Sequence, residues 1–193
     1  MKRSFKPHEL IVLTAVLISV VLPAVAYAGT RAGQDRSVLA SVLGVTCKYL
    51  GRTGERRFEV LDAESTDLQQ VIGSKPELPE AYLDAFRDLL RRNSSRKRLP
   101  AGIACSHIRV VSHERIEELL SHQASAWRNF YAAFPGAEGI IGVSLPGYSA
   151  DGRRAVVYRD GGCGDLCEAG FLVLLRKHGS AWIVERSVGV WIS

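Results

Sequence analysis

The sequence predicts an α+β fold in which N-terminal helices pack on a C-terminal antiparallel β-meander. Two observations support this prediction. Up to about residue 136 the best-patterned segments have apolar residues at helical spacing, whereas later segments are short runs of β-branched and aromatic residues. The connections between these later runs are short, and short connections join antiparallel neighbours.

The first part of the chain contains three expected helices and two expected strands. The helices cover residues 37–50, 80–92 and 112–134, and the last begins at the N-cap Ser112 and ends before Pro135-Gly136. The strands cover residues 57–63 and 103–111, where apolar residues alternate more loosely. In the second strand, Ile108 and Val110 are expected on one face.

The meander is expected to contain five short strands. Asp151-Gly152, a glycine-rich segment and His178-Gly179-Ser180 provide turns between them. The expected strands are residues 139–145, 153–158, 169–177, 181–186 and 188–192.

The first 28 residues have the pattern of a cleavable signal peptide. Positive charges at the start precede an uncharged apolar run over residues 10–25, and Ala26-Tyr27-Ala28 fits a signal peptidase site. An uncleaved anchor is the alternative, because this segment nearly reaches the ~20 residues of a membrane-spanning helix. Pro23 favours cleavage, since it breaks that helix shortly before the site. We therefore expect residues 29–193 to be a single α+β domain that is periplasmic or secreted, or membrane-tethered if the segment stays.

The charge of the mature part argues against a nucleic-acid partner. The chain has 25 Lys and Arg against 20 Asp and Glu, and residues 1–28 hold three of the cations and one of the acids. The mature part therefore has a net charge of only +3. An excess of this size is compatible with loose attraction to anionic surfaces and does not indicate nucleic-acid binding.

The chain has four cysteines, which an oxidising compartment would allow to pair. Cys163 and Cys167 lie in a glycine-rich hairpin tip and are expected to form a small structural disulfide. A redox-active pair or a metal site is the alternative. Three residues intervene where redox motifs have two, and zinc needs further ligands. Cys47 and Cys105 remain, either as a second pair or as separate buried thiols.

A basic run is the main candidate for a binding site. It places five positive charges within residues 91–98: Arg91, Arg92, Arg96, Lys97 and Arg98. Such a run suits anionic lipid headgroups, an anionic cell-wall polymer or an acidic envelope protein. The alternative is a solvated loop after a helix end. The run contains no aromatic residue, so base stacking has no support.

No catalytic, cofactor or metal residue is assigned from motifs. His113-Glu114 begins like a metalloprotease helix, but Glu117 stands where the second histidine is needed. We expect Glu117 and its neighbours to form a solvated first-turn face. Gly142-Val143-Ser144 begins like a nucleophile elbow but lacks its closing glycine. The aromatic residues Trp127, Phe130 and Tyr131 fit the apolar stripe of their helix and are expected in the core.

The last third of the chain carries a series of short motifs. They are Trp127–Tyr131, Phe134–Ile140, Ser144–Ser149, Arg154–Tyr158, Cys163–Cys167, Leu172–Leu175, Trp182 and Trp191–Ser193. This series resembles a family of uncharacterised bacterial extracytoplasmic proteins, whose pattern is W-x-x-F-Y…P-G-x-x-G-I, S-x-x-G-F-N…A-L-V-Y, a C-G-x-L-C-G tip and a final W-I-S. The chain departs from the pattern at Tyr148-Ser149 and at Glu168. The resemblance implies export and one folded unit, and it implies no activity.

Two function classes follow. The first is an exported, disulfide-capable envelope module that binds a partner or wall component without catalysis. The second is a small extracytoplasmic hydrolase or thiol-redox enzyme whose site is assembled from distant residues. An enzyme is expected to show a deep pocket with converging polar groups and shifted pKa values, and a binding module a shallower surface with polar loops.

Overall fold

A computed structural model describes residues 31–50, 57–69, 76–121 and 125–193. The chain divides into two compact units, residues 1–34 and 35–193. In the first unit residues 31–34 are helical, and the expected signal peptide lies outside the described residues. None of the described helices has the length and apolarity needed to cross a membrane. The second unit contains all the described strands and helices α2 to α4.

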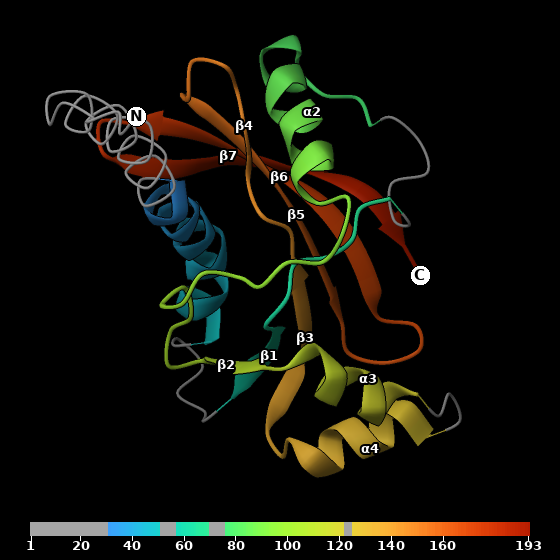
Figure 1. Cartoon of the computed structure of the whole chain (residues 1–193). Coiled ribbons are helices and arrows are strands. Elements are labelled where there is room, and N and C mark those ends of the chain that lie inside the picture. Colours follow the sequence, from blue (N-terminus) through green and yellow to red (C-terminus); the bar gives the residue numbers. More distant parts are fainter. Residues whose placement is uncertain (1–30, 51–56, 70–75, 122–124) are drawn as a thin grey trace, which may run out of the picture. The chain divides into compact units, whose positions relative to one another are not determined.

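The described residues of this unit form a seven-stranded sheet (Figure 1). The strand order is β2-β1-β3-β5-β6-β7, and the short β4 pairs with β5. The strands are β1 (Phe58–Asp62), β2 (Ile108–Val111), β3 (Ala137–Val143), β4 (Gly147–Tyr148), β5 (Arg154–Gly162), β6 (Glu168–His178) and β7 (Ala181–Ile192).

The predicted antiparallel meander is confirmed. Strands β3, β5, β6 and β7 pair in antiparallel order. The two expected strands over residues 181–186 and 188–192 are one strand, β7. Two register shifts in the pairing of β6 with β7 explain the difference, because a bulge bends a strand without ending it.

The first two strands join the sheet differently, because β1 is parallel to both β2 and β3. Parallel neighbours need crossover connections, and the helices supply them. The 3-10 helix η1 (Glu80–Tyr82) and α2 (Leu83–Arg92) lie between β1 and β2. Helices α3 (His113–Leu120) and α4 (Ala126–Ala133) lie between β2 and β3. The α+β class is confirmed, with a small parallel part at the β2 edge.

The single helix predicted over residues 112–134 is wrong, since the structure has α3 and α4 instead. Ser121 and Ser125 flank the break, and serine favours helix ends because its hydroxyl competes for backbone groups. The Ser121 hydroxyl donates to the Glu118 carbonyl at 2.8 Å. Ile116 of α3 and Phe130 of α4 belong to the same core cluster. Both helices therefore place apolar residues toward one core, and the helical spacing of apolar residues continues in the sequence across the break.

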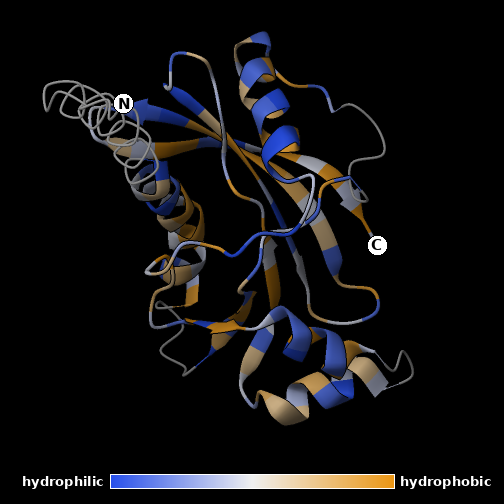
Figure 2. Cartoon of the chain, in the orientation of Figure 1, coloured by the Kyte–Doolittle hydropathy of each residue, from blue (hydrophilic) through white to orange (hydrophobic). Residues whose placement is uncertain are grey.

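Helices cover both faces of the sheet. Residues 35–50 are helical and bury Val38, Leu39, Val42 and Leu43 against one face. Helix α2 packs its apolar residues on the opposite face and leaves the polar side that Figure 2 shows to solvent. Alternation along β5 divides the two cores, because Ala155 and Val157 face the first helix while Val156 and Tyr158 face α2.

Strand β2 is shorter than predicted and forms one edge of the described sheet. Ile108 is buried as expected, but Val110 is 52% exposed. The alternation of apolar residues predicted that Ile108 and Val110 share a face, but the core covers only Ile108.

Candidate functional site

An open cleft lies on the sheet face that carries Tyr158, beside α3 and α4. Two adjoining cavities of about 560 Å³ and 290 Å³ share the lining residues Leu120, Ile140, Gly142 and Asp160 and form this cleft. Charged side chains line one end and two tryptophans line the other. The charged end consists of Asp62, Arg96, His113, Glu117 and Asp160.

His113 is held between two carboxylates at the charged end. Asp62 ends β1 and His113 begins α3, so the β1–β2 pairing brings the two residues together. His113 Nδ1 lies 2.7 Å from Asp62 Oδ2, and Nε2 lies 3.0 Å from Glu117 Oε1. Asp62 is nearly buried; its Oδ1 accepts a hydrogen bond from Glu64 N at 2.8 Å, and Arg96 Nη1 lies 3.7 Å from Oδ2. The ring is therefore fixed in one orientation.

Asp160 forms the floor of the cleft at the end of a hydrogen-bonded chain. Trp191 Nε1 donates to the Tyr158 hydroxyl at 2.9 Å, and this hydroxyl interacts in turn with the Asp160 carboxylate. The Gly142 N–H also donates to that carboxylate. Burial raises the pKa of Asp160, against the opposing effects of these hydrogen bonds and of Arg96. Burial also raises the pKa of Tyr158, so its hydroxyl remains a donor.

Glycines make room for these side chains on the sheet. A Cβ at Gly142 would overlap the Asp160 carboxylate, and a Cβ at Gly170 would overlap the Trp191 ring. A Cβ at Gly162 would lie 3.3 Å from the Trp127 ring. Glycine inside a strand marks a close approach of this kind, so the cleft depends on these positions.

Trp127 and Trp191 line the apolar end with Leu120 and Ile140. The predicted core position is confirmed for Phe130, which is fully buried. It is confirmed in part for Trp127 and Tyr131, which are partly buried and pack against the same core cluster. The Trp127 ring meets Phe130 edge-on at 5.5 Å and also lines the cleft. A helical stripe predicts which residues face inward, but not which of them lie at its border.

All four cysteines are bonded. Cys163 pairs with Cys167 at the β5–β6 turn, and Cys47 pairs with Cys105. The Cys163 N–H donates to the Cys167 carbonyl at 2.9 Å, and the Tyr131 hydroxyl donates to the Cys163 carbonyl at 2.9 Å. The Cys47–Cys105 bond ties the first helix to the segment before β2. None of the four cysteines lines the cleft.

The basic run does not form one cationic patch. Arg92 turns inward, where its Nη1 and Nη2 donate to both oxygens of Asp35 at 2.9 and 2.7 Å. Arg91 pairs with Asp88. Lys97 Nζ donates to the Arg92 carbonyl at 2.7 Å.

The rest of the run points in different directions. Arg96 reaches Asp62 in the cleft, while the Arg98 side chain is exposed and its backbone bridges to Glu64. An anion-binding role of the whole run therefore stays a prediction, and for Arg92 the buried ion pair argues against it.

Two motifs from the sequence have structural roles. Ser144, in the incomplete elbow, is buried, and its hydroxyl accepts a hydrogen bond from Tyr158 N at 2.9 Å. Glu117 lies on a solvated face as expected, since its side chain is 68% exposed, and its Oε1 also lies 3.0 Å from His113 Nε2 at the cleft. Within the described ranges no group of three or more His, Cys, Asp or Glu residues is arranged to hold a metal ion.

The sequence analysis missed Asp62, Asp160 and Trp191 as members of one site. One local signal was available for Asp160, because a carboxylate before two glycines in a β-run is unusual for a packed strand. The other two have no such signal, since their relation to the cleft arises from strand pairing.

Comparison of the chain with known protein families, with curated proteins and with solved structures found no match.

Proposed function

We propose that this protein is an exported, non-catalytic binding module of the cell envelope and that its ligand occupies the cleft. The pairing of His113 carries the proposal. A histidine that activates a nucleophile keeps one ring nitrogen on the nucleophile's hydroxyl or thiol. Both nitrogens of His113 instead face carboxylates, at 2.7 Å and 3.0 Å. The ring therefore acts as part of a rigid recognition surface.

Export is supported by three features of different kinds. The first 28 residues have a signal-peptide pattern, and the C-terminal part resembles an extracytoplasmic family. The two disulfides are compatible with an oxidising compartment.

The cleft suits a hydroxyl-rich ring such as a cell-wall sugar. Ligand pockets combine apolar or aromatic walls with a few polar groups that fix orientation. Trp127 and Trp191 offer flat apolar surfaces for the C–H face of a sugar ring. Asp62 and Asp160 accept hydrogen bonds from hydroxyl groups, and Arg96 donates them.

Titration with N-acetylglucosamine oligomers, followed by tryptophan fluorescence, tests this proposal. We expect saturable binding by the native protein and about tenfold weaker binding by Trp127→Leu, since an aromatic contact contributes up to ~1.5 kcal/mol. Trp182→Phe is the matched control, because Trp182 packs in the core on the opposite face. Absence of saturable binding, or an equal loss in the control variant, would contradict the proposal.

A small hydrolase acting on the same class of ligand is the second candidate. One observation favours it: burial raises the pKa of Asp160 inside a cleft that also contains Asp62 and Glu168. A carboxylic acid with a raised pKa can protonate a leaving group. Chromatography of the same oligomers after incubation at pH 5–7 separates the candidates. Turnover that disappears in Asp160→Asn supports the hydrolase, and binding without turnover supports the module.

The thiol-redox alternative has less support from the geometry. Cys163 and Cys167 line a different cavity of about 460 Å³, together with Glu59 and Arg159. This cavity shares Glu168 with the cleft, but Asp62, His113 and Asp160 are not in its lining.

A further inference from the structure

We propose that a second site, separate from the cleft and independent of the function proposed above, binds phosphate groups where two turns of the sheet meet. The site is a cavity of about 480 Å³, called here the turn cavity. It lies between the β4–β5 turn and the β6–β7 turn. Its charged lining residues are Asp151, Arg153, Arg154, Arg176, Lys177 and His178.

Strand pairing gathers these cations from two segments. Arg154 of β5 stands directly opposite Arg176 of β6 in the register. The Lys177 N–H donates to the Arg153 carbonyl at 2.8 Å, which holds the adjacent residues together. Both turns contain a glycine with positive φ, 65° at Gly152 and 59° at Gly179, a conformation that other residues rarely adopt. The cluster therefore lies on two tight, well-defined turns.

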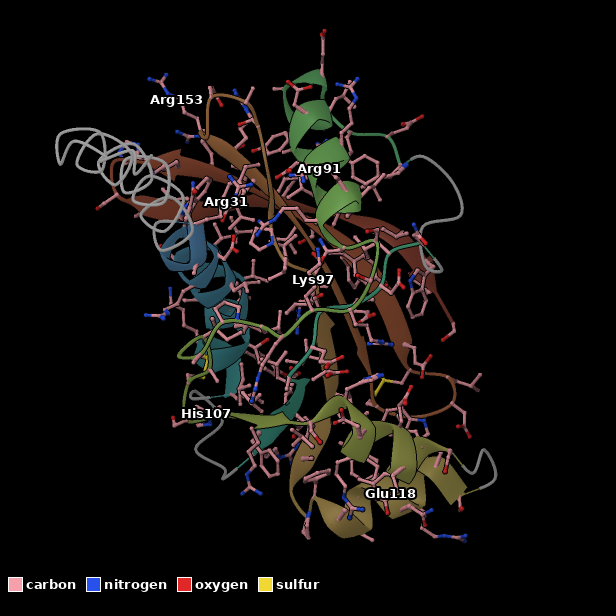
Figure 3. All side chains as sticks on the ribbon, in the orientation of Figure 1. Arg31, Arg91, Lys97, His107, Glu118 and Arg153 are labelled. Atoms are coloured by element: carbon pink, nitrogen blue, oxygen red, sulfur yellow. A yellow bond between two sulfur atoms is a disulfide. The ribbon has the colours of Figure 1, made fainter. Side chains whose placement is uncertain are left out.

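The cations of the turn cavity are positioned without being fully neutralised. The Arg154 guanidinium lies 5.8 Å from the centre of the Tyr82 ring, and Lys177 Nζ lies 5.9 Å from that of Trp182. A ring attracts a cation but leaves its charge in place. Arg176 is paired with Glu185. Arg153 projects from the turn, far from the loop that carries Lys97 (Figure 3).

The one carboxylate in the lining is used by its own turn. Asp151 Oδ1 accepts hydrogen bonds from the Ser149 hydroxyl at 2.6 Å and from Arg153 N at 3.0 Å. These bonds lower the pKa of Asp151, so it stays ionised. With Glu185 also counted, the four Arg and Lys side chains still exceed the carboxylates by two positive charges.

An anion would relieve the repulsion in this arrangement. Like charges directly opposite each other destabilise an antiparallel pair of strands, and Arg154 and Arg176 are such a pair. Arginine forks fit two phosphate oxygens at once, while lysine adds a point charge. The shared chemistry of the ligand is a phosphate group. It comes from an anionic lipid headgroup or from a soluble phosphate.

Two probes distinguish these sources. Inorganic pyrophosphate is titrated by calorimetry, and vesicles of phosphatidylglycerol and phosphatidylcholine are tested by co-sedimentation at 50 and 200 mM salt. The test variant is Arg153→Gln/Lys177→Gln. The control is Lys48→Gln/Arg128→Gln, which removes one lysine and one arginine charge from exposed positions outside the turn cavity and the basic run. Thermal melting checks that both variants are folded.

We expect each removed charge to weaken binding about fivefold, so the test variant should bind about 25-fold more weakly and the control within twofold of the native protein. A loss seen with pyrophosphate assigns a soluble phosphate, and a loss seen only with phosphatidylglycerol vesicles assigns a headgroup. Arg153→Lys should retain binding, which keeps the test valid if the double variant unfolds. Native protein that binds neither probe, or a control that loses as much as the test variant, overturns the proposal.

Discussion

Asp160 both lines the cleft and interacts with the strands that form its floor. Its carboxylate is partly buried on the cleft floor and interacts with Tyr158 and Gly142. Because burial raises its folded-state pKa, the native state binds a proton more tightly than the unfolded chain. Its contribution to stability is fully present below the unfolded pKa and is lost as the pH rises through the folded pKa. Burial shifts the pKa of Glu59 in the same direction.

We therefore predict that Asp160→Asn reduces the fall in the free energy of unfolding as the pH rises from about 4, the ordinary carboxyl range. Asparagine keeps the acceptor for Tyr158 and carries no charge to desolvate. Urea unfolding at pH 4.5, 6 and 7.5 measures the effect. Asp151→Asn is the control, and its effect on the pH dependence of stability should have the opposite sign. Hydrogen bonds lower the pKa of Asp151, so its contribution to stability is present above the unfolded pKa and is lost as the pH falls. A decline as steep as that of the native protein would show that Asp160 does not titrate in this way.

Among the elements, the first helix and α2 are joined by the ion pair of Asp35 with Arg92. Their side chains are only 8% and 13% exposed, and the Tyr148 hydroxyl donates to Asp35 Oδ1 at 2.9 Å. Arg92 also donates to the Pro146 carbonyl. Removing Arg92 leaves the buried Asp35 carboxylate without this counter-charge and, of the contacts described above, with only the Tyr148 hydrogen bond.

We predict that Arg92→Ala lowers the free energy of unfolding by about 3–5 kcal/mol. Arg91→Ala, the neighbouring substitution, should lower it by less than about 1 kcal/mol, because the Arg91 side chain is 74% exposed and Asp88 keeps its hydrogen bond from Tyr148 N. Chemical denaturation of both variants gives the comparison. Similar losses in the two would mean that the buried pair has no special role.

The elements also show how far local pattern determines this fold. The antiparallel strands were predictable because their turns and alternation are local, as in Arg154–Gly162 and Glu168–His178. The parallel position of β1 was not, since it depends on two crossovers. For the same reason Asp62, His113 and Asp160 could not be joined into one site, because they come from β1, α3 and β5. The break after Leu120 was missed because the helical period continues across it.

For the molecule as a whole, the two disulfides should contribute unequally. The Cys47–Cys105 bond closes a loop with a sequence separation of 58, whereas Cys163–Cys167 has a separation of 4. In the chain-entropy model the longer loop gives about 4 kcal/mol and the shorter about 2 kcal/mol. We predict this order for the Cys47→Ser/Cys105→Ser and Cys163→Ser/Cys167→Ser variants in urea unfolding. A larger loss from the short ring would contradict it.

The parallel placement of β1 also has a consequence for the order of folding. The strands β5, β6 and β7 pair through short turns and can form as soon as they are present. Strand β1 must wait for β3, which follows it only after two crossovers, and closing such long loops is slow. Asp62, at the end of β1, joins Asp160 of β5 in one cleft only when that pairing is complete, because β3 lies between β1 and β5. The cleft is thus among the last parts of the fold to mature, and its occupancy by the proposed ligand should report that a newly made chain has finished folding.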